Sequence, residues 1–457
     1  MYYLILIIIL AIFVLISYRL FNKDFLAPSF IVSVTYLASV SAAYIAKLFN
    51  MWNYVDLGLK TTSIVALGVL AFIVGEYITR LIMKKIKRTY KINKEKNTER
   101  DEIIKISNIK IVIIYFFLII TFLTIYIQMI QITGITNDIP RMINEYRNLT
   151  PLFNNTEKAT SINTVAMQMY RASVLFAYIF IYIIINNILL KDKIKNNIKY
   201  FIPIVIIAIT SFFIAGRTDF IRMVVAALFL GIMLYKKVYP KRLKIKNLLT
   251  IGIVAVIIIL PLFYIIMPLI GRNQVDNFWD YITFYIGSPV PSLNEIIARN
   301  EVGNSQHFGQ ETFKGIQGIL SRFNLIDYYE PYQRQWISFN GLSSNIFTGL
   351  KTYYSDFGIS GVILLQIMFS SLVSMLYMVA KHKKNKVYLI FYIFSCSYMI
   401  LDQYRLEKLF SSFLSIDTII YTVYLLIILF YMFKNKDDLK EIIKGGKEII
   451  NGRRITK

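Results

Sequence analysis

The sequence predicts an all-α, polytopic membrane protein of about eleven transmembrane helices. Long apolar runs alternate with short polar connectors along all 457 residues, and 56% of the residues are hydrophobic. Positive charge is concentrated in every second connector, which is typical of loops on the cytoplasmic side of a membrane. Because runs of about 20 apolar residues match a bilayer core of about 30 Å, these patterns exclude a soluble multidomain protein.

Eleven apolar runs are long enough to be membrane spans, although the sixth and the tenth are short. A backbone surrounded by lipid must satisfy its own hydrogen bonds, so each run is predicted to be helical. Runs of this length exclude a transmembrane barrel, whose strands are shorter and alternate in polarity. The predicted spans are 2–18, 27–46, 61–83, 110–131, 165–189, 200–215, 218–235, 249–270, 357–380, 387–402 and 412–433.

The formal charge of +24 is explained by membrane topology, and we therefore expect no nucleic-acid partner. Each basic cluster lies two predicted helices from the next, which assigns these connectors to the cytoplasm. The amino terminus is then outside and the carboxyl terminus inside. The basic clusters lie at 84–110, 191–199, 236–246, 381–386 and in the tail 434–457.

The first apolar run is predicted to be a retained helix rather than a cleaved signal, because Arg19 and Lys23 follow it and no basic leader precedes it. Cys396 is the single cysteine, so no intramolecular disulfide forms. One cysteine and two histidines do not make a metal site of the usual kind, and no cofactor is expected.

Two connectors on the predicted outer side are long, 132–164 and 271–356. They divide the chain into eight helices within 1–270, a polar segment at 271–356, and three helices within 357–433. Long ordered loops on a rigid scaffold usually carry function, so 271–356 is the candidate functional module.

Part of 271–356 is predicted to be an amphipathic helix, which either lies in the membrane interface or packs on the helix bundle. Its apolar residues recur at helical spacing, with Lys314, Gln317 and Arg322 off the stripe. Those apolar residues are Phe313, Ile316, Ile319, Leu320 and Phe323.

An aromatic stretch at 328–336 follows this helix. Aromatic residues at this depth are typical membrane anchors. The alternative is a sugar-binding platform, because aromatic faces accept the C–H face of a pyranose while neighbouring polar groups bond its hydroxyls. Tyr332, Arg334 and Trp336 are the candidate glycan-binding residues.

A four-residue turn joins two predicted helices at Gly216–Arg217–Thr218–Asp219. A cation at this depth is costly and is often functional, and the planar guanidinium of Arg217 suits a phosphate. The alternatives are an arginine that reaches lipid headgroups or one that pairs with Asp219. Arg222 is one helical turn from Asp219, so these two side chains are predicted to meet.

Two further arginines lie near the predicted outer face: Arg171 at the start of the fifth helix, and Arg272 at the end of the eighth. Together with Arg217 they are candidates for a cationic pocket at the depth of the outer leaflet.

Three residues near the outer connectors are candidate proton acceptors. His307 has the side chain that titrates nearest neutral pH, and Glu311 follows it closely. Asp356 is either the N-cap of the ninth helix, with Gly358 and Gly361 allowing close helix contact, or a carboxylate at the mouth of the site.

These motifs, taken in order, resemble those of the oligosaccharide repeat-unit polymerases, also called Wzy-type or O-antigen polymerases. The resemblance spans about 200–380. It rests on the turn Gly216–Arg217–Thr218, on Gly309 with Thr312–Phe313, on Asn345 with Thr348, and on Tyr354, Asp356–Phe357–Gly358 and Gly361. Of the family's functional residues, only the arginine of the turn is carried over, as a phosphate ligand.

The resemblance implies a fold similar to GT-C membrane glycosyltransferases and to O-antigen ligases. It also implies a metal-independent enzyme of the cytoplasmic membrane. Such an enzyme joins repeat units linked to undecaprenyl pyrophosphate into a surface polysaccharide, alongside a flippase and a chain-length regulator as partners. Two rivals remain open, a ligase-like glycan transferase and a transporter or flippase of lipid-linked sugars. Internal repeats would favour a transporter, and none is seen.

Overall fold

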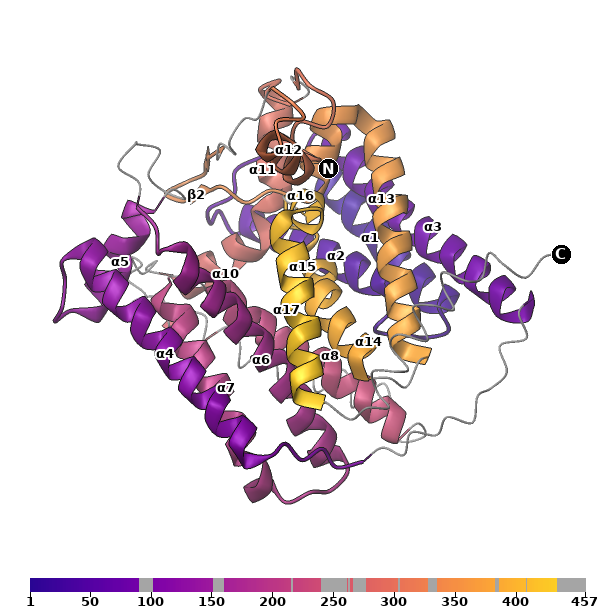
Figure 1. The fold of residues 1–457 in the computed structure, drawn as a ribbon. Helices are drawn as coiled ribbons and strands as arrows, with labels where there is room; N and C mark the ends of the chain where they lie inside the picture. Colours follow the sequence, from indigo (N-terminus) through magenta and orange to yellow (C-terminus); the bar gives the residue numbers. More distant parts are fainter. Residues whose placement is uncertain are drawn as a thin grey trace. The chain divides into compact units, whose positions relative to one another are not determined.

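The computed structural model is predominantly helical (Figure 1). The parts of the chain that it describes are residues 1–89, 102–150, 160–214, 217–239, 261, 264–265, 277–302, 305–327, 335–382, 386–407 and 409–433.

Within these described parts, nine helices are long and apolar enough to cross a membrane. They correspond to nine of the eleven predicted spans, so the prediction of an all-α, multi-pass membrane protein is confirmed. The nine are α1 (Tyr2–Leu20), α2 (Pro28–Leu48), α3 (Leu59–Thr89), α4 (Asn108–Thr133), α6 (Thr164–Leu189), α7 (Ile194–Phe213), α8 (Arg217–Val238), α13 (Leu350–His382) and α17 (Ile416–Phe433).

The other two predicted spans have different outcomes. The run 249–270 lies almost wholly outside the described residues. The run 387–402 is not one regular helix, because α14 (Lys386–Tyr392) and α15 (Tyr398–Asp402) are separated by a π-helical turn, η1 (Ile393–Ser397). The hydroxyls of Ser395 and Ser397 in this turn donate to the carbonyls four residues earlier in the chain. Such bonds compete with the regular backbone hydrogen bonds of an α-helix.

The chain divides into two compact units, one formed by Met1–Arg100 with Tyr235–Thr418 and the other by Asp101–Leu234 with Ile419–Lys457. In the first unit α3 and α13 pack closely along their lengths. A Cβ atom at Gly75 would lie 2.7 Å from the carbonyl oxygen of Ile367, so only glycine permits this approach. The Ser370 hydroxyl donates to the carbonyl of Phe72 at the same contact.

The predicted outer segment 271–356 packs against the helices of the first unit. It contains α10 (Phe278–Gly287), α11 (Pro289–Ala298), α12 (Lys314–Arg322) and a two-residue hairpin of β1 (Ile337–Ser338) and β2 (Ser343–Ser344). The Ser39 hydroxyl of α2 donates to the carbonyl of Ile286 at 2.8 Å. Asn294 of α11 accepts the backbone N–H of Gly58 at 2.8 Å, so the 47–60 connector and this segment share one end of the unit.

The amphipathic helix predicted from Phe313 to Phe323 is α12, and it packs on the short helix α16 (Leu409–Phe413) (Figure 1). A Cβ atom at Gly315 would lie 2.8 Å from the carbonyl oxygen of Leu414, so the two backbones are in close contact. One detail of the predicted stripe is wrong. Gln317 is 6% exposed, and its amide donates to the carbonyl of Phe308 at 3.2 Å.

Helix α13 reverses direction near its start, which corrects the prediction of a simple helix that begins at residue 357. Gly358 has φ 64° and ψ −155°, a conformation that is essentially restricted to glycine. Leu350 contacts Gly68 and Tyr354 lies under Lys60, so the first segment of α13 runs antiparallel to α3. Phe369 then meets Phe72, and the orange ribbon of α13 bends over at its upper end (Figure 1).

The reversal also corrects the roles predicted for Asp356 and Gly361. Asp356 lies inside the first segment of α13 and is not an N-cap, because the helix has already begun at Leu350. A Cβ atom at Gly361 would lie 2.8 Å from the carbonyl oxygen of Tyr353, so this glycine makes room for its own chain rather than for another helix.

Replacing Gly358 with alanine is expected to lower the stability of the protein by about 1–3 kcal/mol, because a Cβ atom strains this backbone conformation. The measurement is the thermal unfolding midpoint of the purified protein in detergent. Gly231 of α8 is the matched control, since a Cβ atom there meets no atom of the described residues within 4 Å. Equal midpoints for the two variants would contradict the reversal.

The second unit contains α4, α6, α7 and most of α17 and α8, together with α5 (Ile139–Leu149) in the predicted 132–164 connector. The Asp138 side chain caps α5 by accepting the N–H of Arg141 at 3.0 Å. The predicted pairing of Arg222 with Asp219 is confirmed at 3.2 Å. Asp219 also accepts the hydroxyl of Tyr170 at 2.7 Å, so its carboxylate is held by two side chains.

Candidate functional site

The clearest polar assembly in the predicted outer part of the first unit is the Glu311 cluster, formed by Glu311, Lys351, Ser355, Asp356 and Glu407. Its base is the carboxylate of Asp356, which faces the connector before α12. This carboxylate accepts the backbone N–H of Thr312 at 2.7 Å and that of Glu311 at 3.1 Å. The Ser305 hydroxyl donates to it as well. Asp356 therefore fixes the connector that carries Glu311.

Glu311 is held by α13 yet keeps contact with solvent. One carboxylate oxygen accepts the hydroxyl of Ser355 at 3.0 Å, and the other lies 3.8 Å from the ammonium of Lys351. Its side chain is 31% exposed. Burial raises the pKa of Glu311, and the positive charge of Lys351 opposes this rise only in part. A carboxylate with a raised pKa and an open side is suited to accept a proton.

Lys351 and Glu407 form a buried ion pair that sequence reasoning missed. The Lys351 ammonium donates to the Glu407 carboxylate at 3.0 Å, and their side chains are 5% and 7% exposed. The two residues are 56 positions apart, so neither spacing nor periodicity relates them. The ammonium also lies 4.7 Å from the ring centre of Phe347.

The start of α13, which carries Lys351, meets the end of α15. The N–H of Gly349, just before α13, donates to the carbonyl of Gln403, just after α15, at 3.0 Å. The side chain of Gln403 donates to that of Gln366 at 2.6 Å. The contact of Leu350 with Gly68 places this junction well inside the length of α3. Non-helical backbone in such a position is tolerated only inside protein or beside a polar cavity, and it marks binding sites in several membrane protein folds.

The remaining candidates from the outer segment have separate positions. His307 lies in the same connector as Glu311, is partly exposed, and donates its backbone N–H to the side chain of Gln310 at 3.4 Å. Trp336 is 50% exposed, just before β1. Tyr332 and Arg334 lie outside the described residues.

The three predicted arginines differ in how much of each the structure describes. The backbone of Arg217 begins α8, but its side chain and all of Arg272 lie outside the described parts of the chain. Arg171 lies in α6 of the second unit, with its guanidinium 5.8 Å from the ring centre of Tyr421. The convergence of the three arginines therefore stays a prediction.

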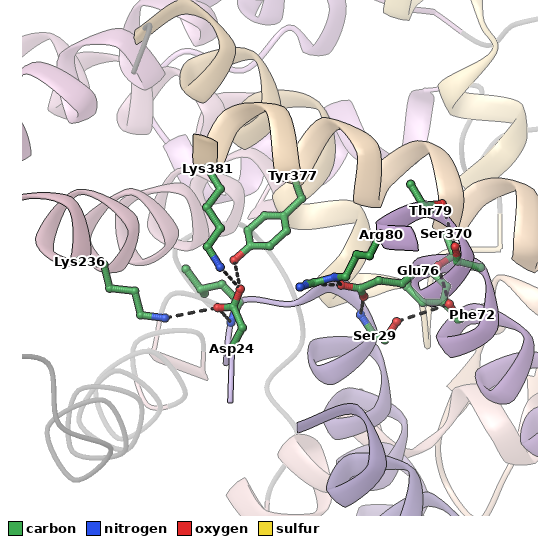
Figure 2. Close-up of polar contacts among 12 residues, drawn as sticks. Asp24, Ser29, Phe72, Glu76, Thr79, Arg80, Lys236, Ser370, Tyr377 and Lys381 are labelled. Carbon is green, nitrogen blue, oxygen red and sulfur yellow. Dashed lines mark hydrogen bonds and ion pairs between the residues drawn. The ribbon is translucent and has the colours of Figure 1, made fainter. Parts of the chain in front are cut away.

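A second polar assembly, the Asp24 cluster, consists of Asp24, Lys236, Tyr377 and Lys381 (Figure 2). The Asp24 carboxylate accepts the Tyr377 hydroxyl at 2.6 Å, lies 3.3 Å from the Lys236 ammonium, and pairs with Lys381. Burial acts to raise the pKa of Asp24, but Lys381, Tyr377 and Lys236 outweigh it and lower the pKa to about 2. Asp24 is therefore an anion that joins the connector after α1 to the ends of α8 and α13.

Close to the Asp24 cluster, Glu76 of α3 is fully buried (Figure 2). One oxygen of its carboxylate accepts the N–H of Ser29 at 2.7 Å, which caps the start of α2. The other accepts the guanidinium of Arg80 at 2.9 Å. A charged pair inside an apolar bundle is costly unless each group is satisfied, and this pair meets that condition.

No known protein family, curated protein or solved structure matches the chain. Its function is therefore inferred from the chemistry of these two assemblies and from the sequence motifs.

Proposed function

We propose that the protein polymerises oligosaccharide repeat units carried on undecaprenyl pyrophosphate, at the outer face of the cytoplasmic membrane. The growing glycan is transferred through its reducing-end sugar to the non-reducing end of the next lipid-linked unit. The glycosidic bond to the pyrophosphate breaks, undecaprenyl pyrophosphate leaves, and the acceptor hydroxyl loses its proton as the new bond forms.

The observation that carries this proposal is the geometry of Glu311. Its carboxylate is oriented by Ser355, partly open to solvent, and raised in pKa by burial. These are the properties of a general base for a sugar hydroxyl. We expect this end of the first unit to face outward under the positive-inside rule, because Lys381 lies at the end of α13 that is far from Lys351 and Asp356.

The leaving group requires stabilisation of negative charge, and the sequence motifs make Arg217, with Arg171 and Arg272, the candidates for this role. Preorganised cations in a poorly hydrated cleft supply such stabilisation. Trp336, with Tyr332 and Arg334, is suited to hold the glycan, since an exposed aromatic face accepts a pyranose ring. His307 stays an alternative base. The lipid tails of both substrates are accommodated by the bilayer.

Deletion of the gene is expected to leave single repeat units on the cell surface where the parent strain shows a ladder of polymer lengths. The measurement is gel electrophoresis of extracted surface polysaccharide, with the gene restored on a plasmid as the control. Polymer that persists on its lipid carrier would support the ligase-like alternative. An unchanged ladder would contradict any role in glycan joining.

A transporter of lipid-linked sugars is the second candidate, and the buried Glu76–Arg80 pair within α3 favours it. Charged groups deep in a helix bundle and interrupted helices are typical of transporters. The deletion experiment separates the two functions. Loss of a transporter leaves lipid-linked units on the cytoplasmic side, whereas loss of a polymerase leaves unpolymerised units outside.

A further inference from the structure

The ion pair of Lys351 and Glu407 lies directly behind the carboxylate of Glu311. Lys351 is 3.0 Å from Glu407 and 3.8 Å from Glu311, so a single buried ammonium is shared between two carboxylates of unequal exposure. Glu407 is almost fully enclosed, whereas the Glu311 side chain is 31% exposed. The Glu407 carboxylate fixes the position of the Lys351 ammonium, and the positive charge of this ammonium acts on the more exposed carboxylate of Glu311.

We propose that Lys351, held in place by Glu407, is a positioning residue that sets the protonation of Glu311. This inference rests on the proposed function, in which Glu311 accepts the proton of the acceptor hydroxyl. Lys351 itself touches no substrate in this scheme. The positive charge of Lys351 favours the ionised form of Glu311, although burial favours the neutral acid. The negative charge of Glu407 partly cancels this effect of Lys351.

The charges that face Glu311 act in opposite directions. Lys351 of α13 favours the ionised carboxylate, whereas Asp356 of α13 and Glu407 of the connector after α15 disfavour it. Asp356 also fixes the connector through backbone N–H groups, so changing it would move Glu311. Lys351 and Glu407 bond to each other through their side chains, so their charges are altered without removing the bonds by which Asp356 holds the connector.

Two substitutions give opposite predictions. Lys351→Met removes the charge that favours ionisation, so Glu311 is expected to stay protonated to a higher pH. Glu407→Gln removes a negative charge that repels the Glu311 carboxylate and that neutralises Lys351. Glu311 is therefore expected to ionise at a lower pH. A change that only loosened the fold would not shift the two variants in opposite directions.

The experiment uses the purified full-length protein in lipid nanodiscs. Labelling of Glu311 by a hydrophobic carbodiimide, which reacts with protonated carboxyls, is followed by mass spectrometry as a function of pH. The pH dependence of glycan extension is measured on the same samples. Lys60→Met is the matched control, since Lys60 is another lysine at this end of the unit and lies over the ring of Tyr354.

The labelling midpoint is expected to rise in Lys351→Met, to fall in Glu407→Gln, and to stay at the parent value in Lys60→Met. The acidic limb of the activity profile should follow the same order. Either single variant leaves a buried charge unpaired, so Lys351→Met/Glu407→Gln is the more stable test. Its midpoint is expected between those of Lys351→Met and the parent, because Lys351 acts on Glu311 more strongly than Glu407 does.

Midpoints that do not move, or that move in the same direction in both single variants, overturn the role of Lys351 even if the protein polymerises glycans. Midpoints that move as stated in a protein without glycan-joining activity overturn the proposed function and leave the coupling of Lys351 to Glu311 intact. The two failures are therefore distinguishable.

Discussion

Replacing Glu311 with glutamine is expected to slow glycan extension by about 10²–10⁴-fold, the contribution typical of a positioned general base. The glutamine oxygen still accepts the Ser355 hydroxyl, so the fold around the site is preserved while proton acceptance is lost. The measurement is the rate of product formation by the purified protein at saturating substrate.

Glu301→Gln is the matched control, because Glu301 is an exposed glutamate in the connector after α11. It is expected to keep the parent rate. A Glu311→Gln protein that also keeps this rate would remove Glu311 from the mechanism and direct attention to His307.

Replacing Glu76 with alanine is expected to lower the free energy of unfolding by about 3 kcal/mol, because removal of one member of a buried ion pair leaves the charge of the other uncompensated. The Arg80 guanidinium and the Ser29 N–H at the start of α2 both lose their partner. The Arg80 side chain is 21% exposed, so we place the loss at the lower end of the usual range. The measurement is denaturant or thermal unfolding in detergent.

A second i,i+4 pair in the same unit provides the comparison. Glu295 lies 3.5 Å from Arg299 in α11, with side chains 22% and 45% exposed. Glu295→Ala is therefore expected to cost about 1 kcal/mol at most. Glu76→Leu/Arg80→Leu, which leaves no unpaired charge, should recover much of the loss. If Glu76→Ala and Glu295→Ala were equally stable, Glu76 would not hold α2.

The class of the protein was predictable because lipid solvation imposes long apolar helices, and nine of the predicted spans are found as helices within the described residues. Ion pairs between residues close together in one helix were also predictable, because helix geometry fixes which side chains are neighbours. Asp219 and Arg222 are one turn apart, and helical geometry alone brings them together.

What could not be predicted depends on contacts between distant parts of the chain. The hydropathy of an apolar run is the same whether the run forms one helix or two. It therefore does not indicate the reversal of α13 at Gly358. The contact of Lys351 with Glu407 requires the junction of α13 and α15. The sequence marks Asp356 as a candidate carboxylate, but not its role in holding the connector before α12. That role depends on the fold, which brings the backbone N–H groups of Glu311 and Thr312 to Asp356 from more than 40 residues away.

The most direct test of the central claim is an assay of the purified protein with a defined undecaprenyl-pyrophosphate-linked oligosaccharide, in lipid and without other enzymes. Products are separated by size on a gel. The proposed function predicts a ladder spaced by one repeat unit, together with released undecaprenyl pyrophosphate. A single band of unextended substrate, under conditions in which the protein is folded, would contradict it.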